Sequence, residues 1–287
     1  MNAYIKQIYN FILKILKQFA TTGFIIFCLV GGMVFPSGVQ AQDSLLTYDH
    51  PDRPPTMEEL LQWKEVFTYK VKFGFFKLGE VKTTIIKDTT YQGQKIWWLR
   101  TVITSNSGIP FVGEEENHYN TFMVETDSTP YTKLYWRDNL DENEFEAEVY
   151  EYDYENEKVY ILENMTPVDT LELTEPSSSG QLIFYYSRLF AGTNQDYRLP
   201  VYLEREKGYI DATNSTKIEK RRYDAFDDPV KTYFSEGDAD IDGPFGFRGK
   251  YKAWYIADDL RVPAEAHAKV WLVNVKVQLI DYKKERR

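Results

Sequence analysis

Apolar and polar residues alternate along most of the chain, which predicts a protein built mainly of β-strands. Residues 67–85 read FTYKVKFGFFKLGEVKTTI, and Phe67, Tyr69, Val71 and Phe73 share one face there. Similar runs, separated by turn residues, predict strands at 66–75, 78–88, 95–104, 119–126, 131–138, 144–154, 158–163, 168–174, 199–210, 215–224, 230–236, 247–257 and 265–282. So many short strands favour a large, curved antiparallel sheet that forms a half-barrel or a barrel-like structure.

Two segments predict helices. Thr56 and Glu59 are spaced as a capping box, which predicts a short N-terminal helix over about 57–65. Apolar residues at helical spacing in 178–191 predict one central helix on the concave face of the sheet. We expect the serines at 177–179 to cap this helix and Gly192 to end it.

The phase of the alternation changes within residues 144–157. Phe145, Ala147 and Val149 share one face, whereas Tyr150 and Tyr152 would lie on the other. A β-bulge would invert the side chains in this way. A tilted strand that is buried on a different side at each end is the alternative.

The first 41 residues are typical of a signal peptide. Lysines precede a 13-residue apolar core, 23–35, and Val39-Gln40-Ala41 places small residues before the expected cleavage site. An uncleaved anchor is the alternative, although the apolar core is short for a membrane span of about 20 residues. We expect a linker and short helix over 42–64, a single β-rich domain over 65–287, and no transmembrane anchor after cleavage.

Cysteine content and charge exclude several classes of function. Cys28, the only cysteine, would leave with the signal peptide, so disulfides and cysteine-based sites are not expected. The net charge is −10, and the lost segment carries lysines but no acidic residue. We therefore expect no nucleic-acid partner and no anionic membrane surface as a direct electrostatic target.

Few motifs in the chain suggest chemistry. Asp238, Asp240 and Asp242 alternate before Gly243, which is the spacing of some calcium loops, but a solvated acidic hairpin loop is the preferred interpretation. The three histidines are far apart, and the many acidic residues make any carboxylate pair uninformative. The sequence predicts no catalytic residue, no metal site and no cofactor.

Aromatic residues are the strongest compositional signal, with 22 Tyr, 18 Phe and 6 Trp. Trp97 and Trp98 are adjacent, so on a strand they face opposite sides. Most rings should pack in the core, but Tyr and Trp also suit amphipathic pockets. The residues predicted to collect around the concave face and to contact a ligand are Tyr69, Phe73, Phe75, Trp98, Tyr186, Arg188 and Trp254.

Three stretches together resemble the exported bacterial domain-of-unknown-function family DUF3108. They are KFGFFKLGEVKTTI, GQLIFYYSRLFAG with a Y-x-x-R pattern at Tyr185 and Arg188, and WYIADDLRVPAEAHAKVWLVNVKVQLIDY. The resemblance covers roughly 65–283 and implies strands wrapped around a helix, similar to periplasmic lipoprotein-carrier folds, with no assigned activity. The third stretch departs from the family at 273–274, where a glycine is frequent.

The motif residues also have structural interpretations. Gly79 would serve a hairpin turn or a close backbone approach, and Glu80 would be exposed or pair with a lysine such as Lys77. Arg188 would complement the dipole at the C-terminus of the helix. Asp258, Asp259 and Arg261 would form a polar turn that an Asp–Arg pair could fix.

These observations lead to three hypotheses of function. The first is an exported periplasmic or cell-surface module, not an enzyme, that binds an apolar or amphipathic ligand, either a lipid or a glycan. The second is an envelope scaffold that binds a protein partner without a small ligand. The third is a carboxylate-based hydrolase. An enclosed apolar cavity would favour the first, and a filled interior with an exposed apolar patch would favour the second.

Overall fold

A computed structural model describes residues 53–287 except 75, 106–115, 140–147, 244–246 and 271–272. The expected signal peptide, its cleavage site and most of the linker lie outside the described residues. No helix within the described ranges is both long and apolar enough to span a membrane.

The described strands form one 14-stranded sheet, with every pair of neighbours antiparallel. Its order is β8-β7-β6-β5-β4-β3-β2-β1-β14-β13-β12-β11-β10-β9. The strands are β1 (Trp63–Phe73), β2 (Phe76–Tyr91), β3 (Gln94–Ser105), β4 (Glu116–Val124), β5 (Tyr131–Asn139), β6 (Glu148–Asp153), β7 (Lys158–Glu163), β8 (Thr166–Glu172), β9 (Tyr197–Leu203), β10 (Glu206–Arg221), β11 (Val230–Gly243), β12 (Phe247–Ile256), β13 (Pro263–Val270) and β14 (Val273–Arg286). The chain is therefore two meanders that the pairing of β1 with β14 joins.

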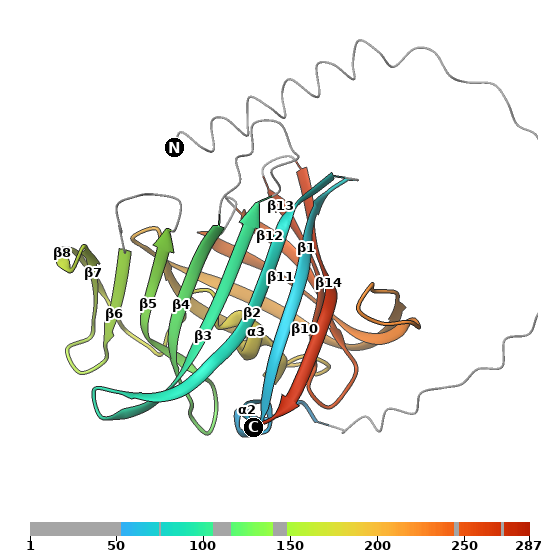
Figure 1. Ribbon diagram of the computed structural model, residues 1–287, viewed down its shortest axis with the longest axis horizontal. Helices are drawn as coiled ribbons and strands as arrows, with labels where there is room; N and C mark the ends of the chain where they lie inside the picture. The colour runs from blue at the N-terminus through green and yellow to red at the C-terminus, as the bar shows by residue number, and fades with distance from the viewer. Residues whose placement is uncertain (1–52, 75, 106–115, 140–147, 244–246, 271–272) are drawn as a thin grey trace, which may run out of the picture.

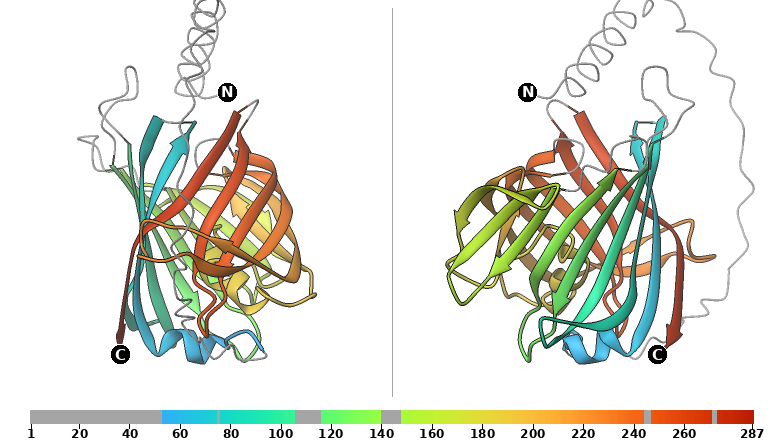
Figure 2. Two further views of the ribbon diagram at one scale, coloured as in Figure 1. Left: turned by 90° about the vertical axis from the view of Figure 1, so that its right-hand side faces the viewer. Right: turned by 60° about the vertical axis from the view of Figure 1, so that its left-hand side comes forward.

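The sheet curls strongly, so that its two halves face each other around a short helical segment (Figures 1 and 2). The stretch between β8 and β9 connects the two ends of this curve. Ser177 O accepts from Thr132 N of β5 at 2.8 Å, and Ser178 N donates to Pro200 O of β9 at 2.8 Å. Ser178 also forms a parallel bridge with Val201. The result is a barrel-like shape, as predicted.

The predicted central helix is much shorter than expected. Only α3 (Ile183–Tyr186) and the 3-10 turn η1 (Ser187–Leu189) are helical. The serines at 177–179 do not cap this helix, because they are extended and bonded to β5 and β9. The segment still lies inside the curved sheet, where Tyr185 is fully buried. Helical spacing alone could not show that its first third is needed to connect the sheet.

The predicted N-terminal helix is present as α2 (Met57–Leu61), with the capping box between Thr56 and Glu59. It ends before Trp63, which begins β1, so the helix is shorter than the predicted 57–65. Leu60 and Leu61 are buried and anchor it to the core.

Two predicted strands proved to be hairpins. The run 199–210 contains the turn between β9 and β10, where Glu204 and Arg205 have φ values of 48° and 59°. The run 265–282 contains the end of β13 and the start of β14. Neither turn carries a glycine, asparagine or proline signal, which is why the alternation continued through them.

Within the described residues, the change of phase near Val149 involves no bulge in strand pairing. β6 pairs with β5 and with β7 without a register shift. Tyr150 and Tyr152 are both buried, while Phe145 and Ala147 lie outside the described residues.

Candidate functional site

A buried ion pair lies at the heart of the core. Glu65 of β1 and Arg188 of η1 have no exposed side-chain surface, and their atoms Oε2 and Nη1 are 2.7 Å apart. Nη2 of Arg188 donates to the second carboxylate oxygen at 3.0 Å, and Nε donates to Leu260 O at 2.7 Å. The Tyr282 hydroxyl of β14 also donates to Glu65, at 2.7 Å. A buried pair with this many hydrogen bonds is satisfied and well ordered.

The electrostatics of this pair follow from its burial. Desolvation by itself would lower the pKa of Arg188, but the Glu65 carboxylate more than offsets it, so the pKa rises and the guanidinium stays charged. Arg188 therefore stabilises the interior. It does not act at an exposed helix terminus, which corrects the expectation from the sequence.

The turn after β12 packs beside the ion pair. Burial raises the pKa of Asp258 to about 6, against the opposing charge of Arg188. Arg261, with φ of 50°, donates to the main-chain oxygens of Ala191 and Asp258 and lies 4.6 Å from the Tyr233 ring centroid. The polar turn is thus held by guanidinium-to-backbone bonds, whereas the sequence suggested an Asp–Arg carboxylate pair.

The predicted ligand residues Tyr69 and Tyr186 belong to the packed interior. The Tyr69 hydroxyl donates to Pro263 O at 2.9 Å, and its ring lies 5.8 Å from that of Phe184 in α3. Tyr186 packs against Phe190 and Tyr197, with centroid distances of 5.4 and 5.2 Å. These aromatic residues meet the helical segment and form the core.

Two further predicted residues lie at the end of β1. Phe73 is partly buried and pairs with Phe76 and Val275 at the β1–β2 hairpin. Phe75 lies outside the described residues. Gly74 has φ of 58°, so it is the glycine of this turn that needs a left-handed conformation. Gly79 instead allows a close approach, because an added Cβ would be 2.1 Å from Thr104 O. Glu80 pairs with Lys77, as predicted.

Trp98 and Trp254 were placed on the concave face, but the structure puts both on the outer face. Trp97 lies in the core and Trp98 points outward, as adjacent strand residues must. Ala253 and Tyr255 likewise pack inside, which turns Trp254 outward. The sequence showed that the two tryptophans face opposite sides but not which one faces inward.

Trp254 is the centre of a cluster of charged and aromatic groups on β10–β14. Its ring centroid is 4.0 Å from the Arg221 guanidinium and 4.7 Å from the His267 ring, and its Nε1 donates to Glu219 at 2.9 Å. Glu265 accepts from Arg221 at 2.9 Å, Lys276 at 2.7 Å and His267 at 2.5 Å. Burial raises the pKa of Glu265, but these three donors outweigh it and lower the pKa to about 2.

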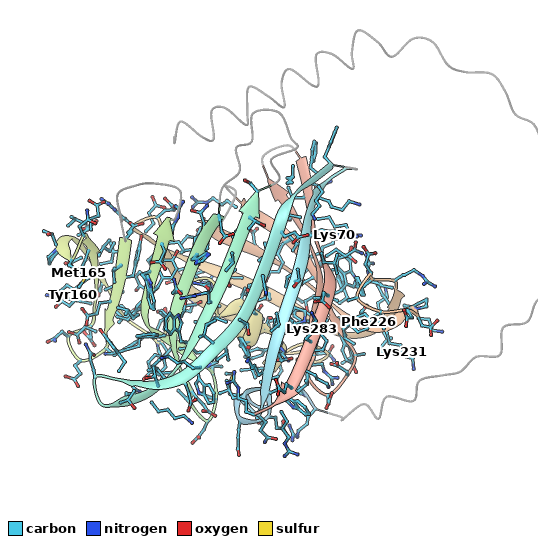
Figure 3. All side chains as sticks on the ribbon, in the orientation of Figure 1. Lys70, Tyr160, Met165, Phe226, Lys231 and Lys283 are labelled. Atoms are coloured by element: carbon cyan, nitrogen blue, oxygen red, sulfur yellow. The ribbon has the colours of Figure 1, made fainter. Side chains whose placement is uncertain are left out.

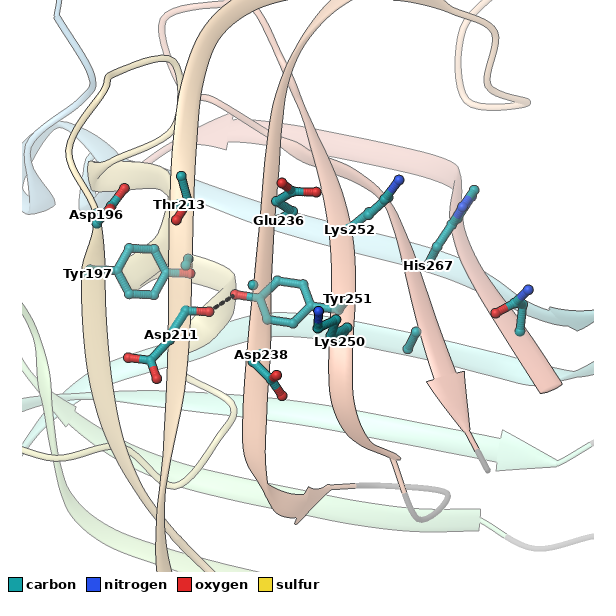
Figure 4. Close-up of a pocket in the computed structure, with 14 residues that line it drawn as sticks. Asp196, Tyr197, Asp211, Thr213, Glu236, Asp238, Lys250, Tyr251, Lys252 and His267 are labelled. Carbon is teal, nitrogen blue, oxygen red and sulfur yellow. Dashed lines mark hydrogen bonds between the residues drawn. The ribbon is translucent and has the colours of Figure 1, made fainter. Parts of the chain in front are cut away.

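An open groove of about 770 Å³ lies next to this cluster, over β9–β13 (Figure 4). Its acidic side comes from β10 and β11, and its basic side from β12 and β13. In the strand register, Glu236 is opposite Lys252 and Asp238 is opposite Lys250. His267 is opposite Lys252 on the far strand and joins the groove to Trp254.

The floor of the groove depends on Gly237. A Cβ at this position would be 1.9 Å from Asp211 O and 2.7 Å from the Tyr251 ring. The absence of a side chain lets Tyr251 cross beneath the floor and donate to Asp211 O at 3.2 Å. Two tyrosines, Tyr197 and Tyr251, thus support the groove from below (Figure 4).

The suggested calcium residues do not lie in a loop. Asp238 and Asp240 are on the extended strand β11, and Asp240 pairs with Arg248 at 2.6 Å. The Asp242 side chain lies outside the described residues. The part of the chain that the structure describes holds no group of three or more metal-ligating side chains.

Sequence reasoning missed Glu65 and the basic side of the groove. Glu65 is in phase with Phe67, Tyr69 and Val71, so an acidic residue on an apolar face was a usable signal of a buried pair. Lys250 and Lys252 alternate with interior residues and carried no signal beyond an ordinary solvated face.

Comparisons with known proteins show a similar fold. No family model matches the sequence, and no curated protein matches it. The chain is similar to the β-barrel-like protein of domain-of-unknown-function family DUF1849 from Brucella abortus, with a TM-score of 0.50 and 10% identity over 78% of this chain and 98% of that chain. A Bacteroides fragilis protein with a YmcC-like fold aligns over 80% of this chain and 98% of its own, with 9% identity and a TM-score of 0.35 that is too low to support an argument. The first likeness shows that this chain has a β-barrel-like fold.

Proposed function

We propose that the protein is an exported, non-catalytic binding module whose ligand occupies the groove over β9–β13. The observation that carries this proposal is the groove itself, whose volume of about 770 Å³ is in the range of small-ligand sites. Its acidic and basic sides provide acceptors and donors on neighbouring strands.

A glycan fits this groove better than a lipid does. Hydroxyl, amine and carboxylate groups of a sugar can bond to Glu236, Asp238, Lys250 and Lys252, which all have exposed side chains. Phe234 and Trp254 border one end and add an apolar surface. In contrast, the predicted lipid-contacting residues Tyr69, Tyr186 and Arg188 pack against one another's neighbours inside the sheet.

Export and family membership are part of the proposal. The lysine-rich start, apolar core and small residues before Gln42 support export to the periplasm or cell envelope. Membership of DUF3108 is supported by the way its motif residues meet, since Arg188 bonds to Leu260 and Tyr69 bonds to Pro263. Amino-terminal sequencing of the protein from the envelope fraction tests export, and a start at Gln42 is expected.

The test of the groove is a binding screen on an array of bacterial-envelope oligosaccharides, followed by calorimetric titration of any glycan retained. Lys252→Ala and Glu236→Ala should each weaken binding at least tenfold. Lys158→Ala, on the distant strand β7, should leave it unchanged. Absence of glycan binding by the wild-type protein, or equal binding by all three variants, would refute the proposal.

A further inference from the structure

The outer face of β3–β7 is apolar, although the inner face of the same strands already forms the core. Residues directly opposite one another on these strands form two rows. The rows are Trp98–Phe122–Leu134–Glu151–Tyr160 and Arg100–Asn120–Trp136–Val149–Leu162. We call these ten residues the outer platform. Every one of its apolar side chains is partly exposed.

The aromatic rings of the outer platform are held in fixed positions. Phe122 lies 5.1 Å from Trp136 and 6.0 Å from Trp98, measured between ring centroids. Asn120, which is fully buried among them, accepts from Trp98 Nε1 at 3.0 Å and from Arg100 Nε at 2.9 Å, and donates to Asp138 at 3.0 Å. A surface whose aromatic anchors are already ordered loses little entropy when it binds.

This face differs from the rest of the sheet. An antiparallel sheet commonly has one face on the core and one polar, solvated face. The outer face of β10–β12 follows this rule with Glu236, Asp238, Lys250 and Lys252. The outer platform breaks it, and contiguous exposed apolar surface of this kind marks an interaction site.

Charge around the platform indicates what covers it. Basic side chains lie at its β2–β3 end, at Lys82, Lys87 and Arg100, whereas Glu151 and Glu172 lie at its β6–β8 end. A two-fold axis through the middle of the platform, near Leu134 and Trp136, would place the basic end of one copy over the acidic end of another. We propose that the outer platform is the dimer interface, packed face to face against the same platform of a second copy of this chain.

Other occupants fit less well. The free strand β8 carries Pro167 and Asp169, which protect an edge from strand addition. An acidic protein with a net charge of −10 is repelled by anionic membranes. Tyr160 and Met165 lie at the outer end of the sheet (Figure 3) and extend the apolar surface toward the rim of the interface, where Met165 is 74% exposed. Aromatic residues and arginine at the centre, with charges at the rim, match the composition of protein interfaces.

The test is sedimentation equilibrium of the full chain between 1 and 200 µM, which is an order-of-magnitude range for interfaces of this kind. The wild-type protein should dimerise, and Trp136→Glu should raise the dissociation constant at least tenfold. Lys231→Glu, outside the platform, is the matched control. Circular dichroism melts verify that each variant is folded.

Paired charge reversals test the two-fold geometry independently. Lys82→Glu/Lys87→Glu and Glu151→Lys/Glu172→Lys should each be monomeric, because like charges then face each other across the axis. Mixed in equal amounts, they should form a heterodimer, since both contacts become attractive. A monomeric wild-type protein, or a mixture that stays monomeric, overturns the proposal. A monomer that cosediments with phosphatidylcholine vesicles would also overturn it and assign the face to a membrane surface.

Discussion

At the residue scale, stability depends on a few charged groups inside an apolar, aromatic core. Glu65 and Arg188 are separated by 123 positions in the sequence and meet at full burial. Removing one partner leaves an uncompensated buried charge, whereas removing both leaves none.

Glu65→Gln and Arg188→Met should each lower the free energy of unfolding by about 3 to 5 kcal/mol. The double variant should be more stable than the sum of the single effects implies, because no unpaired charge remains. Urea denaturation followed by tryptophan fluorescence measures all three. Arg198→Met, which breaks the exposed pair with Asp211, should change the free energy by less than about 1 kcal/mol. Additive single effects would contradict the buried pair.

Asp258 should make stability depend on pH. Its folded pKa of about 6 lies above the ordinary value of 3.8, so the folded state binds the proton more tightly than the unfolded state does. The resulting stabilisation is present below about pH 4 and is lost as the pH rises through 6. Asp258→Asn keeps the oxygen that accepts from Leu260 N, so it should stabilise the protein by about 1 to 3 kcal/mol at pH 7.5 and scarcely at pH 4. Equal effects at both pH values would disprove this.

Glu265 should act in the opposite direction. Its pKa of about 2 lies below the usual 4.5, so its contribution is present above pH 4.5 and is lost as the pH falls toward 2. Glu265→Gln should therefore destabilise the protein by about 2 kcal/mol at pH 7 and by much less at pH 3. Thermal melts across this range measure the difference. Glu219→Gln, at the exposed edge of the same cluster, is the control. A pH-independent loss would point to packing in place of charge.

At the element scale, the extended serines decide how the sheet closes. Thr132 Oγ1 accepts from Ser179 N at 3.1 Å, and both residues are buried. This bond ties the segment before α3 to β5, while Ser178 ties it to β9. The local sequence favours a helix start there, and the two flanking strands override that preference because they provide partners for the backbone.

Thr132→Val should weaken this closure. The change conserves shape but leaves the Ser179 N–H buried without its acceptor, at a cost of about 1 to 3 kcal/mol. Amide hydrogen exchange across 177–182 should accelerate. Thr170→Val, on the exposed strand β8, should change neither quantity. Unchanged exchange in the Thr132 variant would show that the segment is held by other contacts.

At the scale of the whole molecule, β14 joins the two halves of the sheet through its pairs with β1 and β13. Residues near opposite ends of the described chain, such as Trp63 and Arg286, are partners in this ladder. Such pairing makes folding non-local and predicts slow folding for a domain of this size.

Deleting 273–287 should abolish cooperative unfolding, because neither meander then closes on the other. Deleting only 285–287 should retain a sigmoidal denaturation curve, since most of the ladder remains. Urea titrations of the two truncations are the measurement. A cooperative transition in the larger deletion would show that each meander folds independently.

The sequence by itself determined the mainly β class, the curved antiparallel sheet, the capped helix α2 and the opposed directions of Trp97 and Trp98. These features depend on local periodicity and on capping chemistry, both of which can be read from neighbouring residues. Only the tertiary structure decided which face of each strand is buried, so Trp98 and Trp254 moved outward and the groove and outer platform emerged. It also decided the Glu65–Arg188 pair and the serine closure, because both depend on contacts between distant segments. Alternation fixes a period of two but not its phase relative to the core, and that phase is set when the sheet closes.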